Sequence, residues 1–542
     1  MRMRRVLFCL WGFAVGMAPL SIQALEAETE AKARLESIEQ ALADSDLEAA
    51  RRELSAVKAL VGEQLPTVQY FEGRLAFEDG RYPEAIRLLE RAGIEDKPAS
   101  YLRLAKDTQS VMVHHRSAAS AHFVFLYPPG KDEVLAPYAL DTLEAIRTAL
   151  LNDLGYAPPG KVRVEVVGDA EELAKVSTLT LKEINTTGTI AICKFSKLMV
   201  TSPKAVANGY DWQDTLAHEY THLVVTQKGH NSVPIWLQEG LAKYLETAWR
   251  GPPGESMSPS QRALLGRRVK ENKLIPFSKM HPSIAMLPSW EDAYTAFAEV
   301  FFAADYLFKR KGAEGLKTVV EAMAHGSSDQ QAVEEATGQT FADFEKGWMA
   351  HLRAQPVPKG LIPPGEDKVV LKGSTEAAAK GKPAQDKADK GKEISFRDFA
   401  EVVELQPRRD AHLGELFRAR NRMGAAAEEF GKAYALVGDR YEAISNKYAL
   451  ALLSLKRLDE AQKVLEGAVV MHPGSAQTQV HLGRLYLERK DFTRAKGAYL
   501  AALAVDPFDP EVHLALLRVG MALSDTPLTE RARKAVALLT GH

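Results

Sequence analysis

Apolar residues recur along the chain at two spacings, and the spacing changes from one region to the next. From about residue 26 to 110, and again from Phe396 to Leu539, they return every three or four positions, which predicts amphipathic helices. Between these regions, His122–Tyr127 and Lys161–Val167 alternate or are rich in aromatic and β-branched residues, which predicts strands. The chain is therefore expected to be all-helical at both ends and to hold a small sheet in its middle.

Small residues in the C-terminal helical region follow a fixed period. Ala427, Ala461 and Ala495 are each 34 residues apart, and Pro473 and Pro507 keep the same period. This is the period of the tetratricopeptide repeat, in which two helices pack as a hairpin and successive hairpins stack. We expect about three such repeats and a capping helix.

The N-terminal helical region carries a weaker form of the same pattern. Gly73, Ala85 and Ala92 are spaced 12 and 7 residues apart, at the positions where the two helices of a repeat pack closely. So short an array cannot bury much surface alone, and we expect it to dock on the domain that follows.

The middle region is expected to fold as a mixed sheet followed by helices. After the two strands, Thr189–Cys193 and Leu198–Thr201 are expected to form a hairpin. Helices are expected at Val134–Leu154 and, after the hairpin, from residue 211 onward. This order predicts an α+β architecture for the middle of the chain.

Residues 211–246 contain an H-E-x-x-H motif at positions 218–222. On a helix, His218 and His222 lie one turn apart on the same face, so one Zn²⁺ could bind both imidazoles. Glu219 is rotated by about 100° from His218, where it misses the metal but can reach a metal-bound water as a general base. The motif predicts a catalytic zinc site.

A candidate third ligand follows on a second expected helix, which begins near Pro234. Gly229 is expected to end the first helix, and the short loop after it would bring the second helix back across the first. Glu239 lies among large apolar residues, where a carboxylate needs a partner such as a metal. A surface glutamate that pairs on an exposed face is the alternative.

The motif and the second helix together resemble the gluzincins. His218-Glu219-x-x-His222 followed by PIWLQEGLAKY at residues 234–244 is similar to the peptidase MA-like domain of bacterial envelope proteins, which is often joined to tetratricopeptide repeats. The resemblance implies that His218, His222 and Glu239 bind zinc and that Glu219 activates water.

The same resemblance suggests further roles. In gluzincins the edge strand of the sheet binds the extended substrate, and the Thr189–Thr201 hairpin is the candidate here. Tyr294 matches a tyrosine that faces the zinc and could donate to the oxyanion, or it could pack in the helical core. Glu246 could orient a ligand histidine from behind, or it could be solvated.

Two related classes fit less well. The chain has no Gly-x-Met-Glu-Asn stretch, with which zinc aminopeptidases hold the substrate amino terminus, so a strict aminopeptidase is disfavoured. Val225 and Lys228 stand where a metzincin needs Gly and His, and His230 is therefore expected in a loop rather than on the metal.

Length and charge bound the remaining possibilities. A chain of 542 residues should hold several domains, and a net charge of −2 gives no overall attraction to nucleic acid. We expect the following organisation: a signal peptide at 1–24, tetratricopeptide-like helices at 25–115, a zinc metallopeptidase domain at 116–354, a disordered linker at 355–395 and tetratricopeptide repeats at 396–542.

The first residues predict export. Met1–Arg5 is basic, Val6–Pro19 is apolar and Ala24 is a small residue at a suitable cleavage point. An uncleaved membrane anchor is the alternative. After cleavage no stable membrane span and only Cys193 would remain, which rules out an intrachain disulfide. We expect a location in the periplasm or cell envelope of a bacterium.

These observations predict an exported zinc-dependent metallopeptidase that hydrolyses peptide bonds, with Glu219 as general base. The repeats would recruit a peptide or protein substrate or a partner protein. The alternative is a non-catalytic tetratricopeptide-repeat scaffold of the cell envelope, built on a peptidase-derived core.

Overall fold

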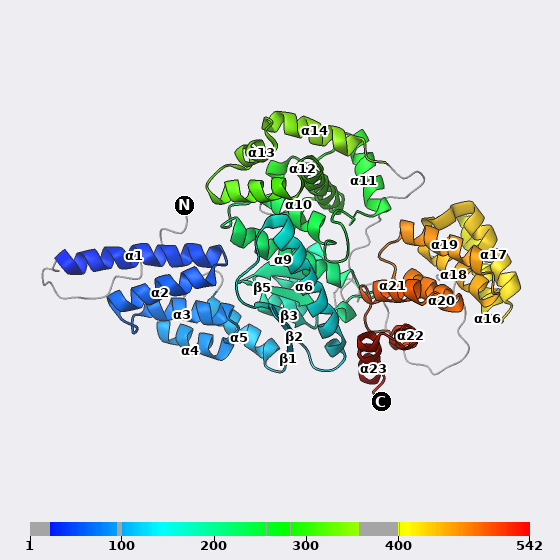
Figure 1. Cartoon of the computed structure of the whole chain (residues 1–542), viewed down its shortest axis with the longest axis horizontal. Helices are drawn as coiled ribbons and strands as arrows, with labels where there is room; N and C mark the ends of the chain where they lie inside the picture. The colour runs from blue at the N-terminus through cyan, green and yellow to red at the C-terminus, as the bar shows by residue number, and fades with distance from the viewer. Residues whose placement is uncertain are drawn as a thin grey trace.

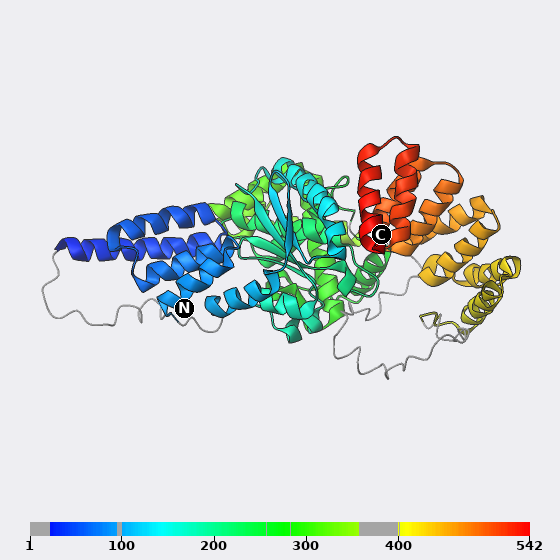
Figure 2. The same ribbon diagram turned by 90° about the horizontal axis from the view of Figure 1, so that it is seen from below.

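The computed structural model describes residues 22–94, 100–255, 257–281, 283–356, 399 and 401–541. Residues 1–21 of the expected signal peptide and residues 357–395 of the expected linker lie outside the described residues. The described chain forms a central part with a sheet, flanked on opposite sides by two groups of helices (Figures 1 and 2).

The N-terminal group consists of antiparallel helices, as the apolar spacing predicted. Their starts and ends follow local sequence: the Asp46 side chain accepts a hydrogen bond from the Ala49 N–H, and Pro66 occupies a first-turn position of its helix. The helices are α1 (Ile22–Ala43), α2 (Leu47–Val61), α3 (Pro66–Glu78), α4 (Tyr82–Ala92) and α5 (Tyr101–Met112).

The central sheet has five strands in the order β1-β2-β3-β5-β4. Its three inner strands run parallel, and each edge strand pairs antiparallel with its neighbour. The strands are β1 (Arg116–Ala119), β2 (Phe123–Tyr127), β3 (Val162–Val167), β4 (Ala191–Lys194) and β5 (Lys197–Thr201). The expected mixed sheet and α+β fold are confirmed, and the β4–β5 hairpin lies at one edge.

One strand was not foreseen. β1 is a short, mostly exposed segment, Arg116–Ala119, that pairs with β2 through Ala118 opposite Phe125. It has no alternating apolar pattern, because only Ala118 packs against the core and its other residues are exposed. Its pairing with β2 is what makes it a strand.

The helices that join the strands are α6 (Leu135–Leu154), α7 (Ala170–Val176) and α8 (Leu181–Thr187), with a 3₁₀ turn η2 (Lys131–Val134) before α6. Val162, Val164 and Val166 of β3 face a core shared with α6, whereas Val167 belongs to a second core. That second core includes Phe77, so the N-terminal helices cover the other face of the sheet. The expected docking of the short N-terminal array is thus observed.

After the sheet, the rest of the central part is helical. Its long helix α12 contains a break at Gly312, where φ is 62°. The helices are α9 (Trp212–Lys228), α10 (Ile235–Leu245), α11 (Pro259–Lys270), α12 (Trp290–Ala324), α13 (Asp329–Thr337) and α14 (Phe341–Arg353). Short 3₁₀ turns lie at η3 (Pro203–Ala205), η4 (Phe277–Lys279) and η5 (Ile284–Met286).

The C-terminal group is a stack of helix pairs. They are α16 (Leu405–Ala419) with α17 (Met423–Val437), α18 (Glu442–Ser454) with α19 (Leu458–Met471), α20 (Ala476–Glu488) with α21 (Phe492–Leu503), and α22 (Pro510–Ala522) with α23 (Thr526–Thr540). The expected single capping helix is instead a full pair, because Ser524 adopts a φ of 56° and the Asp525 side chain caps a new helix. The last pairs lie nearest the central part (Figure 2).

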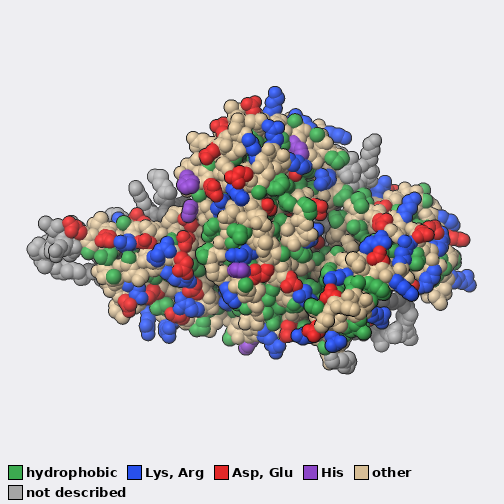
Figure 3. Space-filling model, in the orientation of Figure 1, with side chains coloured by type: hydrophobic (Ala, Val, Ile, Leu, Met, Phe, Trp, Pro, Cys, Tyr) green, Lys and Arg blue, Asp and Glu red, His purple; other side chains and the backbone are tan. Residues whose placement is uncertain are grey.

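The distribution of charge on the surface matches the composition. Basic and acidic side chains are interspersed over the face seen in Figure 3, in keeping with the net charge of −2. Among the described helices, none is long and apolar enough to cross a membrane.

Candidate functional site

Helices α9 and α10 carry the site. α9 buries Leu216, Tyr220 and Leu223 in the main core, and α10 buries Trp236 and Leu237 there. The loop between them turns through His230 and Asn231, which adopt φ values of 46° and 53°. His230 lies in this loop, as expected, and its side chain is exposed.

A glycine allows α10 to pack closely against α12. A Cβ on Gly240 would lie 2.7 Å from the carbonyl oxygen of Val300 on α12, closer than any real side chain allows. This close approach sets the position of α10 against α12, and with it the position of Glu239, the residue before Gly240.

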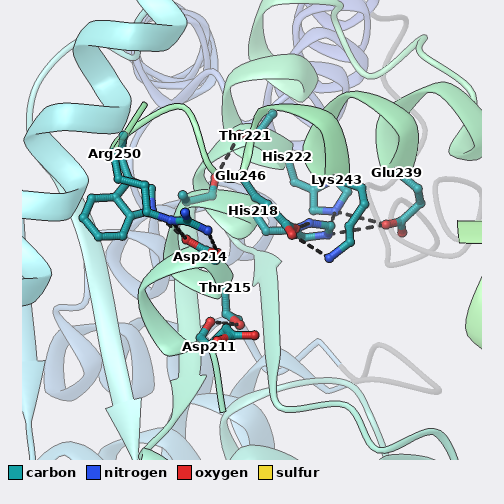
Figure 4. Close-up of polar contacts among 12 residues, drawn as sticks. Asp211, Asp214, Thr215, His218, Thr221, His222, Glu239, Lys243, Glu246 and Arg250 are labelled. Carbon is teal, nitrogen blue, oxygen red and sulfur yellow. Dashed lines mark hydrogen bonds and ion pairs between the residues drawn. The ribbon is translucent and has the colours of Figure 1, made fainter. Parts of the chain in front are cut away.

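The structure brings His218, His222 and Glu239 together (Figure 4). The two Nε2 atoms are 3.1 Å apart, and Oε2 of Glu239 lies 3.5 Å from Nε2 of His218 and 3.6 Å from Nε2 of His222. Within the described residues, this is the one group of three or more His, Cys, Asp or Glu side chains with ligand atoms within 4.8 Å of one another.

A second carboxylate stands behind His218. Nδ1 of His218 lies 3.0 Å from Oε2 of Glu246, whose other oxygen accepts from Lys243. Because a carboxylate can only accept, the proton of a neutral His218 sits on Nδ1, and the lone pair of Nε2 faces the cluster. Glu246 is buried, with 6 % exposure, so the structure rejects the alternative of a solvated glutamate.

Gln238 plays the corresponding part for His222. Its Oε1 lies 3.4 Å from Nδ1 of His222, and its Nε2 donates to the carbonyl of Val233 at 3.4 Å. Both imidazoles are therefore contacted from behind, His222 by a side chain of α10 and His218 by the residue that caps the end of α10. This partner was missed in the sequence, where only its place next to Glu239 could have drawn attention to it.

The electrostatics of the cluster favour positive charge. Burial lowers the pKa of His218, but hydrogen bonds to Glu239 and Glu246 outweigh it and raise that pKa to about 10. Burial raises the pKa of Glu239, yet the nearby His222 and His218 bring it well below its usual value. Two carboxylates thus hold an extra positive charge on His218, in the place where a cation would bind.

The donor set fits zinc. Two imidazole nitrogens and one carboxylate oxygen form the ligand set of catalytic zinc sites, which leave a fourth position open. Two Nε2 lone pairs facing each other at 3.1 Å repel unless a proton or a metal lies between them. Carboxylate support behind a histidine is also typical of metal ligands.

Glu219 lies beside the cluster and next to the sheet edge. It is 9 % exposed, and the backbone N–H of Cys193 on β4 donates to its carboxylate. Burial raises the pKa of Glu219 above its usual value, because the charged carboxylate is disfavoured away from solvent. Burial, with the charge of Glu219, also raises the pKa of the Cys193 thiol, which keeps that thiol neutral.

The hairpin that includes β4 is held by the N-terminal helices. The ring of Phe195, at the turn, packs 5.2 Å from Phe77. Ser196 Oγ donates to Glu78 at 2.8 Å, and Lys197 Nζ donates to the hydroxyl of Tyr82 at 2.7 Å. These contacts join residues more than a hundred positions apart, and no local pattern in the sequence announces them.

The C-terminal repeats contact the start of α9. The indole N–H of Trp212 donates to the carbonyl of Leu503 at 2.9 Å, and the backbone N–H of Trp212 donates to Ala504 at 3.2 Å. The N–H of Tyr210 donates to Val505 at 3.3 Å. The end of α21 thus holds the first turn of the helix that carries His218 and His222.

Tyr294 lies near the start of α12, where the resemblance placed it. It is 38 % exposed, and its ring lies edge-on to Trp290 with centroids 5.9 Å apart. Its proposed role at the oxyanion stays a prediction.

Comparisons with known proteins agree with this geometry. The Peptidase MA superfamily matches residues 143–354, and a tetratricopeptide repeat matches residues 452–518. A search among curated proteins finds no match.

Several solved structures are similar in part. One titled "MamA RS-1 ArsTM double mutant" is 20 % identical with a TM-score of 0.24, over 27 % of this chain and 81 % of that chain. "Structure of native yeast LTA4 hydrolase" is 12 % identical with a TM-score of 0.28, over 79 % of this chain and 66 % of that chain.

The resemblance stated from the motifs is thus confirmed. The chain contains a Peptidase MA superfamily domain, within which His218, His222 and Glu239 meet, and a tetratricopeptide repeat segment follows it.

Proposed function

We propose that the chain is a zinc-dependent metallopeptidase of the gluzincin type, which hydrolyses peptide bonds. The observation that carries the proposal is the convergence of the ligand atoms of His218, His222 and Glu239 within 4.8 Å. It is supported by their place in a Peptidase MA superfamily domain and by the buried Glu219 beside them.

The residues divide the work as follows. Zinc bound by the three ligands would supply Lewis acidity, which polarises a carbonyl and makes water more acidic. Glu219 would take the proton of the attacking water and return it to the leaving amine, with its carboxylate held by the Cys193 N–H. Tyr294 would donate its hydroxyl to the oxyanion.

The residues behind the ligands would hold the two imidazole rings in place. Glu246 would hold the ring of His218 and Gln238 that of His222, so that both Nε2 lone pairs stay directed at the same point. The edge strand β4, whose Cys193 N–H contacts Glu219, would align an extended peptide with the site.

The repeats would recruit a protein substrate or a partner protein, and residues 1–24 would direct export to the periplasm or cell envelope. Sequencing the amino terminus of the protein recovered from the envelope fraction tests export. A chain that begins at Leu25 supports it, whereas an intact Met1 in the cytoplasm contradicts it.

Metal content and cleavage of a mixed peptide library test the peptidase. The wild type should hold about one zinc per chain and cleave peptides. Glu219→Gln should keep the zinc and lose activity by roughly 100-fold or more, because its amide cannot take up the proton. Glu239→Gln should bind zinc more weakly, and the exposed Glu171→Gln should match the wild type.

The outcomes separate the alternatives. Full cleavage by Glu219→Gln would remove this residue from its role, and a wild type that binds no zinc would overturn the proposal. Stoichiometric zinc without cleavage of any peptide would favour the non-catalytic scaffold.

A further inference from the structure

The C-terminal repeats form a groove whose lining includes none of the candidate metal ligands. It has a volume of about 800 Å³ and is lined mainly by α18, α20 and α22, the first helices of three consecutive pairs, with Phe492 and Tyr499 added by α21. Its walls include Leu450, Val480, Leu487 and Ala515, all of which are half-buried. The walls therefore offer apolar surface that the fold itself leaves partly open to solvent.

The lining is arranged in rows set by the 34-residue period. Val480 and Leu514 occupy equivalent positions of α20 and α22, and Leu453 and Leu487 occupy equivalent positions of α18 and α20. Between these two apolar rows, one turn from each, lie Arg484 and Arg518, which are also 34 residues apart. The groove thus presents two guanidiniums flanked by apolar side chains.

The charges in the groove are unbalanced. The lining holds Lys456, Arg484, Lys490 and Arg518 but only two carboxylates, Glu488 and Glu511. Glu488 is already paired with Lys456 at 2.7 Å. In the described part of the chain, neither Arg484 nor Arg518 forms an ion pair, although both are exposed.

This positive charge shifts the pKa values of two buried groups. Burial raises the pKa of Tyr499 to about 12, and both Arg484 and Arg518 lie near enough to its ring to oppose that rise. Burial, together with the charges of Arg484 and Lys447, lowers the pKa of His481 to about 4, so that it adds no compensating or further charge. Tyr499 forms part of the lining, and the two guanidiniums therefore converge on one region of it.

We propose that this groove binds an acidic segment of another protein, with two carboxylates facing Arg484 and Arg518 and apolar side chains on either side. Arginine binds carboxylates through two parallel hydrogen bonds, which makes it suited to this contact. Side chains on one face of an extended peptide repeat about every 7 Å, so carboxylates two residues apart would lie on the same side of the peptide, where two long and flexible arginine side chains could meet them.

The groove is fixed relative to the metal ligands. Carbonyl oxygens at the end of α21, a helix that also lines the groove, accept the hydrogen bonds of Trp212 and Tyr210 at the start of α9. This inference extends the recruiting role of the repeats in the proposed function. Binding at the groove does not depend on zinc chemistry, so the two can fail separately.

Fluorescence anisotropy with the full-length protein tests the proposal. The probes are three labelled peptides of one length, in which leucines flank a Glu-x-Glu, a Gln-x-Gln or a Lys-x-Lys sequence. The Glu-x-Glu peptide should bind at least about 10-fold more tightly than the other two, and its affinity should fall as salt is added. Peptide integrity is checked by mass spectrometry after each titration.

Variants assign the binding to the groove. The double variant Arg484→Gln and Arg518→Gln should abolish the preference for the Glu-x-Glu peptide. Because both side chains are exposed, this variant should still fold. Arg409→Gln, an exposed arginine of α16 outside the groove, is the matched control and should bind as the wild type.

Three outcomes of the binding experiments would overturn the proposal. They are equal affinity for the three peptides, tighter binding of the Lys-x-Lys peptide, and a double variant that keeps the preference. A dimer that forms through Arg484 and Arg518 without peptide binding would also overturn it, because it would assign the groove to a second copy of the chain. Peptide binding by a protein that lacks zinc would leave the groove proposal standing even if the peptidase proposal fell.

Discussion

At the scale of single residues, the site depends on side chains that stand behind the candidate ligands. His218 can offer Nε2 to a metal only while its proton stays on Nδ1, and the carboxylate of Glu246 at 3.0 Å keeps it there. Glu246 is in turn paired with Lys243, so its orientation is fixed within a buried network. The metal-binding geometry is therefore expected to depend on a residue that would not touch the metal.

Glu246→Gln tests this dependence. The amide keeps the size of the side chain but loses the charge that holds the Nδ1 proton, so zinc affinity should fall by about 10- to 100-fold. Competition with a chromogenic chelator measures the affinity, with Glu171→Gln on α7 as the control. Unchanged affinity in a folded Glu246→Gln protein would contradict the supporting role.

At the scale of elements, the β4–β5 hairpin is shaped by a part of the chain that lies far away in sequence. Its turn places Phe195 and Ser196 at φ values of 57° and 54°, which is costly for a residue as large as phenylalanine. The contacts of Phe195 with Phe77 and of Ser196 with Glu78 offset this cost. The N-terminal helices therefore stabilise the edge strand that borders Glu219.

The buried Glu78 makes this contact sensitive to pH. Burial raises its pKa from 4.5 to about 7, while Ser196, Arg74 and Lys197 oppose the rise and Asp79 adds to it. The pKa of Glu78 is higher in the folded protein than in the unfolded chain. Its contribution to the stability of the fold is therefore fully present below pH 4.5 and is lost as the pH rises through 7. The loss should be on the order of 3 kcal/mol.

Glu78→Gln should remove this pH dependence, since its amide does not titrate in this range. The melting temperature of the full chain at pH 5 and at pH 8 measures it in the wild type and the variant. Glu90→Gln, which is half exposed on α4, serves as the control and should keep the wild-type difference. An equal pH response in Glu78→Gln and the wild type would show that Glu78 does not titrate at this interface.

At the scale of the whole molecule, both helical groups are docked on the peptidase domain rather than tethered beside it. The N-terminal helices complete the core on one face of the sheet, and the C-terminal repeats meet the first turn of α9 (Figures 1 and 2). Arg531 on α23 adds an ion pair with Asp141 on α6 at 2.7 Å. A ligand in the repeat groove would therefore be held at a constant distance from the candidate metal site.

Gly209→Ala tests the docking of the C-terminal repeats. A Cβ there would lie 2.3 Å from the carbonyl oxygen of Val505, and Gly209 has a φ of 72°. Gly338→Ala is the control, because its φ of 69° gives the same strain, roughly 1–2 kcal/mol, with no atom within 4 Å of the new Cβ.

The two variants should give different melting curves in calorimetry. Gly209→Ala should separate the melting of the repeats from that of the peptidase domain and lower both transitions, whereas Gly338→Ala should show only a small decrease. Indistinguishable melting curves for the two variants would mean that the contact at Val505 does not hold the repeats in place.

Local spacing by itself determined the elements and the candidate ligands. The period of a helix puts His218 and His222 on one face, and the 34-residue period fixes the register of the repeats, because both depend only on the geometry of a regular helix. The place of Glu239 followed from two apolar helices joined by a short loop. These features need no knowledge of distant parts of the chain.

Tertiary structure decided the contacts between distant segments. Whether Glu246 would reach His218 or lie in solvent depended on how α10 crosses α9, and the pairing that makes β1 a strand depended on β2. The bond from Trp212 to Leu503 joins residues 291 positions apart. Such contacts arise from the packing of whole faces against one another, and the local pattern at either partner contains no information about which face it will meet.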